Sequence, residues 1–68
     1  MRDEFGYIVD NDGDLYAVKD GLLVQTYVPE TREWVIYSKP HIPHIESGAI
    51  PEKIMLKKTG GVRPIESK

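Results

Sequence analysis

The sequence contains no cysteine, which excludes disulfide bonds and thiolate zinc sites. It also has no run approaching the roughly 20 apolar residues that a membrane-spanning helix requires. Its start, MRDEFG, does not have the basic and then apolar order of a secretory signal peptide. We therefore expect a cytoplasmic protein without membrane contact, because a reducing compartment suits a chain without cysteine.

Signals for enzymatic chemistry are also missing. Gly60-Gly61 has neither the Lys-Ser/Thr pair nor the following helix of a phosphate-binding loop. Ser38 and Ser47 lie near the histidines in sequence, but catalytic triads are assembled by the fold and not by sequence proximity. A chain of 68 residues can hardly enclose a ligand pocket of roughly 300 Å³ or more. The sequence predicts a non-enzymatic protein that uses no cofactor.

Charge is small in total but unevenly distributed. The formal net charge is −2. Residues 1–50 hold four basic and nine acidic side chains, giving −5, and residues 51–68 hold five basic and two acidic side chains, giving +3. A nucleic-acid binder usually combines a basic face with stacking aromatics, whereas the aromatics here all lie in the acidic part. This distribution argues against nucleic acid as a partner, although a basic-tail nucleic-acid binder is the third hypothesis below.

Turn signals divide the first half of the chain into four segments rich in β-forming residues. Asp12-Gly13 and Asp20-Gly21 favour two-residue hairpin turns, because both central residues of such a turn need positive φ. Pro29-Glu30-Thr31-Arg32 marks a third turn, since proline presets φ and cannot continue a central strand. The sequence predicts a mainly β fold, a four-stranded antiparallel meander over Phe5–Asn11, Asp14–Lys19, Leu22–Val28 and Glu33–Ser38.

The stretch DNDGDLYAVKDG has the alternating aspartates of a calcium loop. An EF-hand loop requires a glycine at its sixth position and a bidentate Glu at its twelfth. Counted from Asp10, these positions are Leu15 and Gly21. We therefore interpret Asp10, Asp12 and Asp14 as turn residues.

Two-residue turns would fix the register of the hairpins and so assign each side chain to a face. The expected cross-strand pairs are Val9 with Tyr16, Tyr7 with Val18, Val18 with Leu23, Ala17 with Val24, Leu15 with Thr26, Tyr27 with Trp34 and Thr26 with Val35. One face would be rich in aromatics, with Gln25 as its polar exception: Phe5, Tyr7, Val9, Tyr16, Val18, Leu23, Tyr27, Trp34 and Ile36. The other would be aliphatic: Ile8, Leu15, Ala17, Leu22, Val24, Thr26, Val28, Val35 and Tyr37.

Two apolar faces are unusual, because an antiparallel sheet that is solvated on one side shows one apolar and one polar face. The rest of the chain offers only about four apolar residues as cover. SKPHIPHIES should run extended because of its prolines. Residues 50–58 would form either a short C-terminal helical turn, with Pro51 near its start and Gly60 near its end, or a fifth strand, and we favour the helical turn. The domain would span residues 1–58, followed by a flexible basic tail, residues 59–68.

One face would then remain free to bind another chain. We expect Ile50, Ile54 and Leu56 to cover the aliphatic face and the aromatic face to bind, because rigid aromatics dominate interface energetics. The expected partner-binding residues are Tyr7, Tyr16, Tyr27, Trp34 and Ile36. The partner would be a second copy, with a dimer favoured, or another protein.

The stretch LYAVKDGLLVQTYVPETREWV resembles a blade of a Kelch propeller. Tyr27, Pro29, Thr31 and Trp34 match the Tyr-x-Pro-x-Thr turn and following Trp of such blades. The resemblance implies a four-stranded meander packed on both faces. The paired glycines of that family are absent and only one blade-length unit is present, so we interpret the match as convergence on a common hairpin.

HIPHIE supplies His41, His44 and Glu46, three side chains that zinc accepts as ligands. A strand directs His44 and Glu46 to the same side, whereas a polyproline segment aligns His41 with His44. Regular backbone geometry does not bring all three together. We therefore favour a proline-ordered connection with exposed histidines over a metal site. KPHIP also contains the proline pair of a P-x-x-P ligand, a pattern that is common by chance.

Three functional hypotheses remain. The first is a non-enzymatic interaction module that self-associates or binds a protein through an apolar sheet face, such as a bacterial or phage accessory or inhibitor protein or a virion assembly subunit. The second is a metal-stabilised module that uses His41 and His44. The third is a nucleic-acid binder that uses the basic tail.

Overall fold

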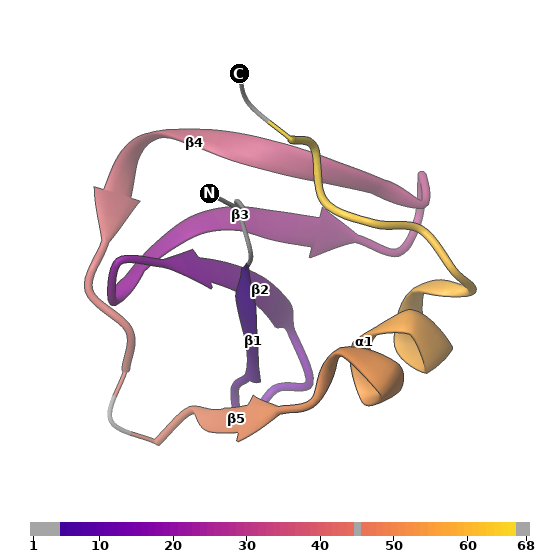
Figure 1. The fold of residues 1–68 in the computed structure, drawn as a ribbon, viewed down its shortest axis with the longest axis horizontal. Helices are drawn as coiled ribbons and strands as arrows, with labels where there is room; N and C mark the ends of the chain where they lie inside the picture. The colour runs from indigo at the N-terminus through magenta and orange to yellow at the C-terminus, as the bar shows by residue number, and fades with distance from the viewer. Residues whose placement is uncertain (1–4, 45, 67–68) are drawn as a thin grey trace.

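The computed structural model describes residues 5–44 and 46–66, which form one antiparallel sheet and one helix. The strand order is β4-β3-β2-β1-β5. Figure 1 shows β1 turned steeply relative to β3 and β4, so the sheet is strongly twisted. The elements are β1 (Gly6–Val9), β2 (Leu15–Lys19), β3 (Leu22–Val28), β4 (Glu33–His41), β5 (Gly48–Ile50) and α1 (Glu52–Thr59). The predicted meander is confirmed, and residues 48–59 supply both a fifth strand and a helix.

Two of the three predicted turns have the expected geometry. Asp20 and Gly21 have φ values of 56° and 79°, as a two-residue type I′ turn requires, and Lys19 pairs with Leu22 across it. The four-residue turn between β3 and β4 places Tyr27 opposite Trp34, as predicted.

The predicted register of β1 and β2 is wrong by one residue. Val9 pairs with Leu15 instead of Tyr16, because the loop is longer than two residues. The Asp10 N–H donates to the Asp14 carbonyl (3.1 Å) and the Gly13 N–H donates to the Asp10 carbonyl (3.0 Å). Gly13 has a φ of 86°. This is the three-residue hairpin loop in which a type I turn is followed by a left-handed residue.

A bulge in β3 changes the register a second time. Val18 pairs with Leu23, as predicted, but Ala17 pairs with Gln25, so Val24 is an extra residue between them. The expected pairs of Ala17 with Val24 and of Leu15 with Thr26 are therefore wrong. A one-residue slip transfers side chains to the opposite face. The face assignment is wrong for β2: Leu15 and Ala17 lie in the core, and Tyr16 lies on the other side.

The helix is bounded by the residues that the sequence indicates. Pro51 is its N-cap with an extended ψ of 157°, and Gly60 ends it in the left-handed region with a φ of 67°. Met55 is fully buried, whereas the neighbouring Ile54 is 38% exposed. The expectation that Ile54 helps to cover a face of the sheet is therefore wrong. Met55 is the apolar residue of α1 that is fully buried in the core.

The core lies on one side of the sheet, which we call the inner face. It combines three aromatic side chains with aliphatic side chains from the sheet and α1: Tyr7, Leu15, Ala17, Tyr27, Trp34 and Met55. The Trp34 ring lies 5.4 Å from the Tyr27 ring and 6.4 Å from the Tyr7 ring, centroid to centroid. The aromatic residues thus form the covered face, in contrast to the expectation that they remain free.

The segment after α1 also covers the inner face. Residues 60–66 return across the sheet alongside β3 and β4 (Figure 1), and Pro64 is buried there. Of the expected flexible tail, residues 59–68, Thr59 belongs to α1, and Trp34 and Gln25 hydrogen-bond to residues 62–65; residues 67–68 lie outside the described residues. Across the described residues, no helix has the length and apolar character needed to cross a membrane.

Candidate functional site

The side of the sheet opposite the core, which we call the outer face, carries one continuous row of side chains across all five strands. The pairings Ala49 with Ile8, Ile8 with Tyr16, Tyr16 with Thr26 and Thr26 with Val35 define it. We call this set the outer row. Val35 is 46% exposed and Ile8, Tyr16 and Thr26 are half-buried. The row presents apolar and amphipathic surface with Tyr16 on the central strand β2.

The sequence-predicted binding residues do not share this face. Tyr7, Tyr27 and Trp34 are 7%, 9% and 4% exposed and lie in the core beneath α1 and residues 60–66. Ile36 pairs with Gln25 on the inner face, where it lies at the sheet edge and is 51% exposed. Tyr16 alone of the five is on the outer face.

Tyr16 is tied to the acidic loop between β1 and β2. Its hydroxyl donates to Asp10 Oδ2 at 3.0 Å. Burial, together with this bond to Asp10, raises the pKa of Tyr16 to about 12. The hydroxyl therefore stays protonated and continues to donate through the neutral pH range.

Asp10 organises that loop with one carboxylate. Its Oδ1 accepts the N–H groups of Asp14 at 2.9 Å and Asp12 at 3.0 Å. The bond from the Asp14 N–H, with those from Tyr16 and Asp12, lowers the pKa of Asp10, and the nearby His44 acts in the same direction. These bonds favour the ionised carboxylate, so the aspartates form a structured negative patch beside Tyr16.

The end of β4 adds further aromatic surface. The Tyr37 and His41 rings meet edge to face with centroids 4.7 Å apart. Leu23 pairs with Val18 and with His41 and is only 6% exposed, although it is not part of the core cluster. Leu23 thus lies on the outer face, where it is a buried apolar residue beside the end of β4.

The structure does not gather the predicted metal ligands. Glu46 accepts a hydrogen bond from Asn11 Nδ2 at 2.8 Å, while His41 packs on Tyr37. Over residues 5–44 and 46–66, the only three potential ligand side chains that lie close together are Asp10, Asp12 and Asp14, whose oxygens lie within 4.8 Å of one another. Asp10 already accepts three hydrogen bonds, so its carboxylate is the least available of the three for a cation.

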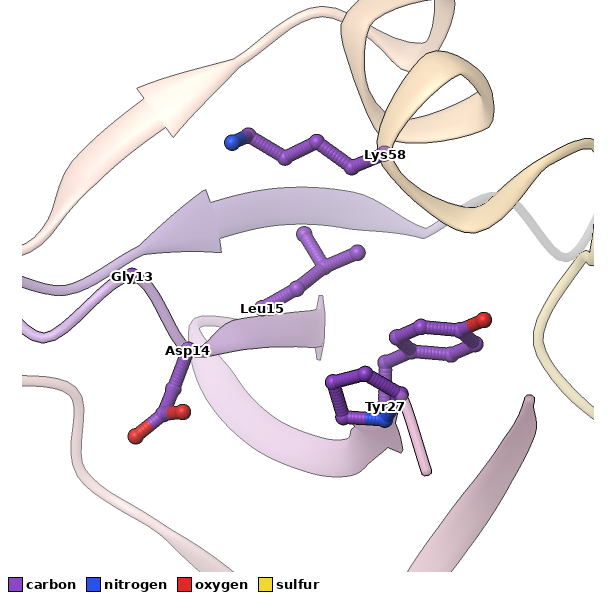
Figure 2. Close-up of a pocket in the computed structure, with 6 residues that line it drawn as sticks. Gly13, Asp14, Leu15, Tyr27 and Lys58 are labelled. Atoms are coloured by element: carbon purple, nitrogen blue, oxygen red, sulfur yellow. The ribbon is translucent and has the colours of Figure 1, made fainter. Parts of the chain in front are cut away.

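A shallow pocket opens on the inner side, where the β1–β2 loop meets α1. Figure 2 shows Lys58 extending from α1 above Leu15 and Tyr27, while the Asp14 carboxylate points away from the side chains of these residues. The lining residues are Gly13, Asp14, Leu15, Tyr27, Pro29 and Lys58, and the volume is about 190 Å³. This is below the roughly 300–1,000 Å³ that small-molecule sites occupy.

Sequence reasoning missed the role of Gln25. Its side chain is 3% exposed and forms two hydrogen bonds with the backbone of Ile65: Nε2 donates to the carbonyl at 2.7 Å, and Oε1 accepts the N–H at 3.0 Å. The available signal was its position as the single polar residue on a predicted apolar face, because a buried amide requires partners.

A comparison with known proteins finds no matching family model, no similar curated sequence and no similar solved structure.

Proposed function

We propose that this protein is a non-enzymatic interaction module that associates with a second copy of itself through the outer face. The observation that carries the proposal is the outer row. It is continuous from edge to edge of the sheet and ends in the 46% exposed Val35. Tyr16 at its centre is the amphipathic kind of residue that is enriched at interface hot spots.

The positions of the other elements support the proposal. Met55 of α1 packs among the core residues, and residues 62–65 bind Trp34 and Gln25, so both segments lie on the inner side. Among the described helices and strands, none remains to cover the outer row, and the connection between β4 and β5 lies beside it, where Glu46 bonds Asn11 and His44 lies near Asp10. The largest apolar patch on a soluble protein is often functional.

The area of the outer face limits the affinity that we expect for the dimer. Five strands spaced about 4.8 Å apart span roughly 20 Å, and a five-residue strand is roughly 17 Å long. One face thus offers about 350 Å², and two copies would bury roughly 700 Å² in total. Stable interfaces bury about 1,200–2,000 Å². We therefore expect a weak dimer, with a Kd on the order of 0.1 mM.

A second copy is the partner that we propose for this face. Two sheets can stack face to face at about 10 Å, with the same row on both sides of a two-fold axis. The net charge of −2 is small, but the aspartates beside Tyr16 repel their counterparts, so the β1–β2 loops of the two copies would have to lie apart. A different protein partner is the alternative outcome. The cytoplasmic location is part of the proposal and is supported by the absence of cysteine.

Val35→Asp and Ile36→Asp form a matched pair of variants that tests the proposal. These neighbours in β4 are 46% and 51% exposed and belong to opposite faces. Sedimentation equilibrium over about 10 µM to 1 mM should show the wild type and Ile36→Asp changing from mainly monomer to mainly dimer, and Val35→Asp remaining a monomer. Thermal unfolding would confirm that both variants fold. A wild type that stays monomeric throughout, or variants that dissociate equally, would contradict the proposal.

A further inference from the structure

The inner face binds residues 62–65 through side chains that recognise backbone. Trp34 Nε1 donates to the Val62 carbonyl at 3.1 Å, and Gln25 Nε2 donates to the Ile65 carbonyl at 2.7 Å. The two carbonyls are three residues apart, which is the repeat of a polyproline helix. Pro64 lies buried between them. We call this surface over Trp34 and Gln25 the inner groove.

Two side chains of the segment, Val62 and Pro64, pack against the inner face, whereas the other two of residues 62–65 are largely exposed. Arg63 is 59% exposed in its side chain and forms an ion pair with Glu52, and Ile65 is 47% exposed. Within residues 62–66 as described, no backbone–backbone hydrogen bond reaches the sheet. The sheet ladder and the helix are thus complete without the segment, unlike a strand that is paired into a sheet.

Gly60 and Gly61, which connect α1 to the segment, do not depend on the segment for their hydrogen bonds. The Gly60 and Gly61 N–H groups both donate to the Leu56 carbonyl, so the end of α1 is capped locally. Both glycines have positive φ, 67° and 94°, which glycine adopts without strain. Detachment of residues 62–66 would therefore leave the helix end intact.

From these contacts we infer that the inner groove is a binding site for an extended, proline-containing peptide, and that residues 62–66 occupy it in cis. The occupant in trans is a partner segment with the pattern of Val62-Arg63-Pro64-Ile65: an aliphatic residue, any residue, proline and a fourth residue that Gln25 recognises through its backbone. Aromatic-lined grooves are a recurring way to bind extended, proline-containing segments. A tethered segment acts at an effective concentration in the millimolar range, so it shields the groove until it is released.

Trans-complementation tests the inference. Val62→Asp combined with Pro64→Asp places two charges in the buried part of the segment and leaves the groove residues unchanged. Trp34 is the only tryptophan, so its emission should shift to the red in this double variant. A synthetic peptide with the sequence of residues 60–66 should restore the original emission in a saturable manner, with a Kd of roughly 10 µM to 1 mM. A peptide carrying both aspartates should bind at least about tenfold more weakly.

Several results would overturn the inference. One is a folded double variant whose Trp34 emission does not change, or changes and is not restored by the peptide. Another is a double variant that unfolds and that the peptide does not refold, because residues 62–66 would then be an integral part of the core. Exchange of the segment between two wild-type copies would assign the groove to self-association instead of a partner.

Hydrogen exchange on the unmodified chain provides a second test that requires no variant. The Trp34 indole hydrogen and the Ile65 amide should exchange at least about tenfold faster than the slowest amides of β2, because release of the segment is a local opening. Equal rates would show that the segment leaves the groove only on global unfolding.

Discussion

Met55→Ala is the substitution that most directly tests how the inner face is covered. Met55 is 0% exposed and packs with the aromatic core of the sheet, and Thr59 Oγ1 lies 3.8 Å from its sulfur. Truncation of a buried methionine costs about 2–4 kcal/mol through lost transfer free energy and the cavity that remains. Domains of this size have a total stability of roughly 3–10 kcal/mol, so the loss is a large fraction.

Ile54→Ala is the matched control, because Ile54 is the preceding residue of α1 and is 38% exposed. We expect it to change the free energy of unfolding by no more than about 1 kcal/mol. Urea unfolding followed by circular dichroism measures both variants, and an unchanged slope would show that the unfolded states are comparable. The core assignment would be refuted if Met55→Ala cost no more than Ile54→Ala.

Three further predictions concern the loops. Gly13→Val and Gly21→Val should each lower the free energy of unfolding in urea by about 1–3 kcal/mol, because φ is 86° and 79° at these positions. A Cβ at either position meets no atom within 4 Å, so the cost comes from backbone strain alone. Variants as stable as the wild type would contradict the hairpin geometry. The pKa of Asp10 is lower in the folded protein than in the unfolded chain. The ionised Asp10 carboxylate therefore stabilises the fold above the ordinary carboxyl pKa, and this stabilisation is lost as the pH falls through the pKa of the folded state. Asp10→Asn should therefore reduce the decline of the unfolding midpoint between about pH 4 and pH 2, and an unchanged profile would speak against the Asp10 bonds. Millimolar calcium or zinc should shift the melting temperature by less than about 2 °C in the wild type and in a His41→Ala, His44→Ala double variant. A shift of about 5 °C or more would indicate a metal site, at the histidines if the double variant loses the shift and at the aspartates if it keeps it.

Local signals predicted most of the secondary structure. Strands β2 and β3 match their predicted bounds at all but one end, and the turn at Asp20-Gly21 has the expected positive φ values. The left-handed end of α1 lies at Gly60, as predicted. These features depend on the conformational preferences of a few adjacent residues, which sequence carries directly.

The assignment of the faces could not be predicted in the same way, because it depends on loop length to within one residue. The Asp10 side chain accepts hydrogen bonds from the Asp12 and Asp14 amides and so stabilises a three-residue loop. The Asp12-Gly13 pair by itself favours a two-residue turn. The bulge at Val24 then shifts the pairing again. Each shift transfers side chains to the other face, as for Leu15, Ala17 and Tyr16 of β2. The aromatic face itself is not free, because α1 and residues 62–65 cover it, which the register alone could not indicate.

The central claim is that two copies meet through the outer row. Isotope-filtered NOE spectroscopy on a mixture of labelled and unlabelled chains, at about 1 mM, detects contacts between copies without altering the protein. The proposed function predicts intermolecular NOEs from the methyl groups of Ile8 and Val35 and from the Tyr16 ring. Intermolecular NOEs confined to Ile36 and other inner-face residues, or none at all from a chain that sediments as a monomer, would contradict it.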